Sequence, residues 1–173
     1  SFRPLSHGQR REKASRCHVA GCAAIGAINE MLTQAEANAL IAMRKRFVAP
    51  RPISLPPGID ETHELIGEDK REHFLLDLWR GTMRLSKYKM QTRGRIIVVL
   101  VRLDINGAPH TNPDGQILDG THLHLYREGF DDKWAYPVDP ELFHDVEDAG
   151  TAFKDFCRYC HIEEIPPYQE VLL

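Results

Sequence analysis

The chain of 173 residues has the size of one domain with a short extension. Its formal net charge of -3 with neutral histidines gives no global field that attracts nucleic acid or a membrane surface. Any nucleic-acid role therefore has to come from a local basic patch. No run approaches the roughly 18 apolar residues that a membrane span needs, and the longest, residues 96–101, is typical of a buried strand.

The four cysteines fall into two pairs, Cys17/Cys22 and Cys157/Cys160. The spacing within these pairs allows one four-cysteine zinc site. Residues 157–161 also match the short haem c attachment pattern, but haem attachment needs export, and residues 1–30 hold no credible export signal. We therefore interpret the cysteines as ordinary packed residues of a reduced, cytoplasmic protein.

Residues 1–30 are rich in Arg, Ser, Ala and Gly and show no clear period, so we expect an N-terminal extension of doubtful structure there. A single domain is expected over residues 31–173. It begins with a capping-box sequence, Thr33 followed by Glu36, and apolar residues then recur at helical spacing. This pattern predicts a helix over residues 33–47 that ends before a proline.

A series of alternating or apolar segments follows and predicts about five strands. These are residues 62–66, 72–80, 86–91, 95–105 and 121–126, with a short further strand at 134–138. A second helix is expected over residues 140–159, with Phe143, Val146, Phe153 and Phe156 as core residues. The order predicts an α+β fold in which both helices pack on one face of a mainly antiparallel sheet.

Polar side chains are expected to gather on the other face, because alternate residues of a strand point to the same side. They are Lys87, Lys89, Gln91 and Arg93 on one strand, Arg102 and Asp104 on the next, and His122, His124 and Tyr126 on the last, with His110 arriving from a nearby turn. Lysines on such a face are commonly solvent-exposed without a role. Two imidazoles about 7 Å apart on one strand favour a function.

The first candidate function is RNA cleavage without a metal, although the residues leave open whether the chain is an enzyme. His122 and His124 would share the acid and base roles near neutral pH. Phosphate would be held by Arg102 and the basic strand, Lys87, Lys89, Gln91 and Arg93. His110 and Tyr126 would assist, and Asp104 would orient a histidine or the arginine.

Two alternatives use the same face. His110, His122, His124 and Asp104 form a plausible nitrogen and oxygen ligand set for zinc or another divalent transition metal, either in an enzyme or in a metal-stabilised protein. The cupin metal motif matches only in its first half. The other alternative is a module that binds RNA or a protein partner without turnover, with no membrane role.

Three motifs occur in order, Arg102-Leu-Asp104, Pro109-His110 and His122-Leu-His124. Their succession resembles TumE-type toxins of bacterial toxin–antitoxin modules and a related uncharacterised bacterial and phage family. The resemblance covers about a third to half of the chain. It implies a small toxin-like ribonuclease domain with a cognate antitoxin as protein partner. The loop at residues 111–120 is an insertion relative to the simpler pattern.

Overall fold

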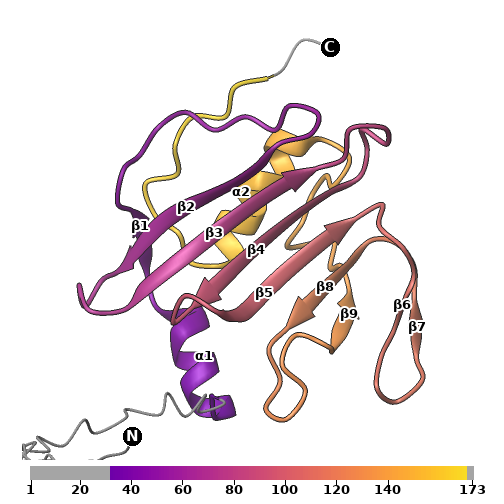
Figure 1. Cartoon of the computed structure of the whole chain (residues 1–173), viewed down its shortest axis with the longest axis horizontal. Coiled ribbons are helices and arrows are strands. Elements are labelled where there is room, and N and C mark those ends of the chain that lie inside the picture. Colours follow the sequence, from indigo (N-terminus) through magenta and orange to yellow (C-terminus); the bar gives the residue numbers. More distant parts are fainter. Residues whose placement is uncertain (1–31, 171–173) are drawn as a thin grey trace, which may run out of the picture. The chain divides into compact units, whose positions relative to one another are not determined.

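A computed structural model describes residues 32–170, so the prediction for residues 1–30 lies outside the described part. These residues form an α+β fold with one large antiparallel sheet, a two-stranded hairpin and two helices (Figure 1). Neither helix is long and apolar enough to cross a membrane. In chain order the elements are α1 (Gln34–Ala42), β1 (Lys45–Phe47), β2 (Asp60–Gly67), β3 (His73–Arg80), β4 (Tyr88–Gly94), β5 (Val98–Ile105), β6 (His110–Thr111), β7 (Ile117–Leu118), β8 (His122–Leu125), β9 (Ala135–Pro137) and α2 (Ala149–Tyr159).

The main sheet has seven strands in the order β1-β2-β3-β4-β5-β8-β9, and every neighbouring pair is antiparallel. The α+β class and the mainly antiparallel sheet are confirmed. The predicted count of about five strands is wrong, because β1 and β9 also pair with the sheet. Strand β9 lies within the short strand expected at residues 134–138, whereas β1 lies inside the expected first helix.

One face of the sheet carries the hydrophobic core and is covered by α2 (Figure 1). Phe153 and Phe156 of that helix are fully buried, and each such side chain contributes about 1.5–3 kcal/mol of burial free energy. The sheet residues on this face include Phe74, Leu76, Leu78, Tyr88, Met90, Thr92, Leu103 and Ile105. The opposite face of the same strands is left to the polar residues.

Helix α1 begins as expected but ends early. The Thr33 hydroxyl accepts from the Glu36 amide, and the Glu36 carboxylate accepts from the Thr33 amide. The helix stops at Ala42 because Lys45 pairs with Gly67 of β2, and strand pairing overrides the helical pattern. The Lys45 ammonium then donates to the carbonyls of Ile41, Met43 and Cys160. Figure 1 shows α1 at the end of the sheet, while α2 lies across its face.

Helix α2 is shorter than predicted at its start. It begins at Ala149 because the Asp148 carboxylate caps it by accepting from the Thr151 amide at 2.7 Å. Residues 140–148 form turns instead, in which the Asp145 carboxylate accepts from two following amides. Of the two core residues predicted in this segment, Phe143 is buried without being helical, and Val146 is partly buried against the core.

Candidate functional site

The polar face of the sheet carries two rows of side chains that run across the strands. In one row Asp77, Gln91, Arg102 and His124 occupy successive positions on β3, β4, β5 and β8. In the next row Trp79, Lys89, Asp104 and His122 do the same. We predicted that the basic strand, the Arg-Asp strand and the two histidines share one face of the sheet. The strand register confirms this prediction.

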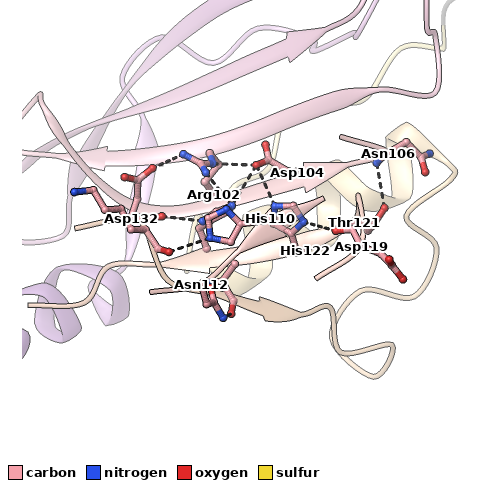
Figure 2. Close-up of polar contacts among 12 residues, drawn as sticks. Arg102, Asp104, Asn106, His110, Asn112, Asp119, Thr121, His122 and Asp132 are labelled. Carbon is pink, nitrogen blue, oxygen red and sulfur yellow. Dashed lines mark hydrogen bonds and ion pairs between the residues drawn. The ribbon is translucent and has the colours of Figure 1, made fainter. Parts of the chain in front are cut away.

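Three imidazoles meet at the β8 end of these rows (Figure 2). The ring centroids of His122 and His124 lie 4.8 Å apart. The His110 ring lies 4.6 Å from that of His124 and 5.5 Å from that of His122. One nitrogen of each ring lies within 4.8 Å of the others. His122 and His124 are 2% and 0% exposed, so this histidine cluster is largely closed to solvent.

His110 reaches the cluster because residues 110–118 fold into a separate hairpin, β6–β7. The buried Asn112 side chain fixes this hairpin to the sheet by accepting from the Ala135 amide and donating to the Ala135 carbonyl, both at 2.8 Å. The turn uses Gly115 at a φ of 90°, a conformation that favours glycine. The insertion at residues 111–120 thus positions His110 beside the two histidines of β8.

Each imidazole has one nitrogen engaged by a backbone carbonyl. His122 Nδ1 lies 2.6 Å from the Asp119 carbonyl, His124 Nδ1 lies 2.8 Å from that of Asp132, and His110 Nε2 lies 3.0 Å from that of Lys133. A carbonyl can only accept, so these nitrogens carry the ring protons. In the neutral rings the remaining nitrogens are His122 Nε2, His124 Nε2 and His110 Nδ1, and each keeps a lone pair.

Asp104 lies against the two histidines of β8. Its Oδ2 atom is 3.6 Å from His122 Nε2 and 3.3 Å from His124 Nε2, and it accepts from Arg102 Nε at 3.1 Å. Burial acts to raise the pKa of Asp104. Hydrogen bonds that the Nε2 atoms of the histidines donate when the rings are protonated, together with the charge of Arg102, outweigh burial and hold that pKa well below its usual range. Asp104 is therefore ionised at neutral pH.

The two histidines that face Asp104 have pKa values shifted in opposite directions. The hydrogen bond to Asp104 raises the pKa of His122 against the opposing effect of burial. Burial lowers the pKa of His124, and the charge of Arg102 lowers it further, although Asp104 acts in the other direction. The geometry explains the difference, because Arg102 Nη2 is 2.8 Å from His124 Nε2 and can donate to its lone pair.

Three of the predicted site residues are committed elsewhere. Arg93 donates to Asp77 through two nitrogens, at 2.7 and 2.8 Å, and Gln91 donates to the same carboxylate at 2.8 Å. Tyr126 does not join the polar face, because β8 ends at Leu125 and its ring turns into the core. The Tyr126 hydroxyl donates to the Leu32 carbonyl at 2.7 Å. Its predicted assisting role has no geometric support.

Sequence reasoning missed two residues that shape the cluster. Asp132 pairs with the Arg102 guanidinium, and its carbonyl accepts from His124. Asn112 is buried and holds the hairpin of His110. No local sequence pattern marks either residue, because their partners, Arg102 for Asp132 and Ala135 for Asn112, lie on strands that are distant in the sequence.

The cysteines within the described residues are packed in the core. Cys157 and Cys160 are free thiols, 0% and 1% exposed, and burial raises the pKa of Cys160 to about 12. This matches the expectation of ordinary packed residues. The zinc site that would also need Cys17 and Cys22 falls partly outside the described residues.

Residues 32–162 match the model of DUF6978, a family of unknown function, and the chain belongs to this family. Searches of curated proteins and of solved structures found no match. The family match does not test the resemblance to TumE-type toxins, which stays a prediction.

Proposed function

We propose that the chain is a metal-dependent hydrolytic enzyme whose divalent transition metal ion, zinc in the first instance, is bound by His110, His122 and His124. One observation carries the proposal: each of the three rings bonds a backbone carbonyl through one nitrogen, and the three rings bring one nitrogen each within 4.8 Å of the others. Histidines that bind metals are held in this way by partners beyond the metal, which fix the tautomer and the ring orientation.

The ligand set suits zinc. Imidazole nitrogens bind Zn²⁺ at about 2.0–2.1 Å, and three nitrogens around a tetrahedral ion lie about 3.4 Å apart. The three nitrogens here lie within 4.8 Å of one another, so ligation draws the widest pair together by about an ångström or more. His110 is the least buried of the three histidines, so its ring meets the least packing against such a movement.

Three protein ligands leave a fourth position for water, as in catalytic zinc sites. Asp104, ionised and held by Arg102 next to the Nε2 atoms of His122 and His124, would be the residue to take a proton from a water bound there. A cation on His124 Nε2 would compete with Arg102 for the same lone pair. Arg102 also contacts Asp104 and Asp132, and these two ion pairs do not involve that lone pair.

Metal content of purified, untagged protein tests the proposal. The wild-type chain is expected to hold one equivalent of zinc, and His122→Ala/His124→Ala to hold none. A matched control, His73→Ala/His144→Ala, removes two exposed imidazoles outside the cluster and should keep its zinc. The first variant removes two buried rings and could unfold the chain. His110→Ala is therefore measured as well, because the His110 ring is only half-buried.

Absence of zinc binding to the folded wild-type chain would contradict the proposal, as would equal binding by the cluster variants. Asp104→Asn separates the two roles of the site. That variant should keep the zinc and lose hydrolytic activity, because the asparagine amide cannot accept the proton from water.

A second candidate, RNA cleavage without a metal, is favoured by the opposed pKa shifts of His122 and His124 on either side of Asp104. Such a pair can divide acid and base roles. Because both rings are buried, the β6–β7 hairpin would have to move before RNA reached them. Cleavage of single-stranded RNA that persists in a chelator and is lost in His122→Ala/His124→Ala is the expected result. No cleavage by the wild-type chain would reject this candidate.

A further inference from the structure

A hollow of about 230 Å³ lies on the polar face next to the histidine cluster. It is lined by Trp79, Lys87, Tyr88, Lys89, Asp104 and Gly107. Asp104 belongs to both places, because its carboxylate touches the histidines while its residue forms part of the hollow's wall. A ligand in this hollow therefore lies next to Asp104, the residue that links the hollow to the proposed metal site.

The two lysines of the hollow carry uncompensated charge. Among residues 32–170, neither Lys87 nor Lys89 forms an ion pair or donates a side-chain hydrogen bond, although both are only partly exposed. Lys89 lies directly across from Asp104, but that carboxylate is taken by Arg102 and the histidines. The Lys87 ammonium lies 5.8 Å from the centre of the Trp79 ring, at the limit of a cation–π contact.

The other cations of this face are neutralised. Arg93 is paired with Asp77, and Arg102 with Asp104 and Asp132. Adding a divalent ion to three neutral imidazoles increases the positive charge next to the free lysines. A concave site with such a field attracts anions, and a phosphate dianion offers acceptor oxygens to the ammonium groups and to the metal together.

We infer that this hollow binds the phosphate group of a small phosphorylated substrate, held by Lys87 and Lys89 on one side and by the metal on the other. The inference rests on the proposed metal site and names the substrate class for it. The volume is below the 300–1,000 Å³ or so of ordinary ligand pockets, so it admits a phosphate and little more than one ring. The Trp79 indole supplies a flat apolar wall for that ring.

Trp79 provides the means of measurement. The chain has two tryptophans, so Trp134→Phe leaves Trp79 as the only one. The zinc-loaded Trp134→Phe protein is titrated with ribose 5-phosphate, with inorganic phosphate and with uncharged ribose. Saturable quenching of the Trp79 fluorescence is expected with the two phosphates and not with ribose. Removal of zinc by a chelator should weaken phosphate binding at least tenfold.

Lys87→Ala/Lys89→Ala, made in the same background, should lose affinity for both phosphates by at least tenfold. Arg71→Ala/Lys154→Ala removes two exposed charges elsewhere and should leave the affinity unchanged. Equal affinity in the lysine variant, or no phosphate binding by protein that holds zinc, overturns the inference and leaves the metal site standing. Phosphate binding through the lysines by protein that holds no zinc overturns the proposed function instead.

Discussion

The polar face of the sheet has two ends that differ in how their polar atoms are used. At the β2–β4 end the Asp77 carboxylate accepts from Thr62, Gln91 and Arg93, at 2.7 to 2.8 Å. At the β5–β8 end three imidazoles keep one lone pair each when neutral, and among residues 32–170 only that of His124 has a hydrogen-bond donor, from Arg102.

The difference separates a structural cluster from a functional one. Around Asp77 the charged side chains are already paired with each other, so a ligand bound there would form no new ion pair. Around Asp104 the cluster holds three imidazole nitrogens within 4.8 Å of one another, an arrangement that a cation stabilises. The residue types overlap at the two ends, and only the partners tell the two ends apart.

The largest expected effect is stabilisation of the wild-type chain by zinc. Zinc at a free concentration about 100 times its Kd should raise the free energy of unfolding by about 2.7 kcal/mol, because only the folded chain holds the three nitrogens together. Thermal denaturation with and without zinc measures the shift. His122→Ala/His124→Ala should show none, and a shift of the same size in that variant would place the ion elsewhere.

A smaller loss of stability is expected from the other end of the face. Asp77→Ala leaves the Arg93 guanidinium without its carboxylate partner. The side chains of Asp77 and Arg93 are only 13% and 24% exposed. The free energy of unfolding should fall by about 2 kcal/mol, between the values for exposed and buried ion pairs. Urea denaturation measures it, with the exposed Asp60→Ala as control. Zinc affinity should not change, and a change would mean that the two ends are coupled.

The smallest effect concerns the pH dependence of zinc affinity. Zinc needs neutral imidazoles, so protons compete with it as the pH falls. Asp104 raises the pKa of His122, so this competition begins above the ordinary imidazole value of 6.5. Below that raised pKa the affinity should fall about tenfold per pH unit for each protonated ring. Asp104→Asn removes the cause and should move the onset to lower pH. An unchanged onset would show that Asp104 does not govern this titration.

Sequence periodicity determined much of the fold. Alternation over residues 72–80, 86–91 and 121–126 predicted strands that exist, and it assigned Arg102, Asp104 and the β8 histidines to one face. This works because the period of a strand is local and the side chains obey it wherever the strand pairs. The capping box of α1 is local in the same way.

Tertiary structure decided what depends on partners distant in the chain. Residues 45–47 left the predicted helix because a strand was available to pair with them. Tyr126 left the polar face because β8 ends one residue before it. His110 lies beside the other histidines because Asn112 holds its hairpin in place. Hydrogen bonds to three backbone carbonyls determine which nitrogen of each ring carries the proton. The sequence determined which residues share the face, and only the folded chain determined which of their nitrogens remain free.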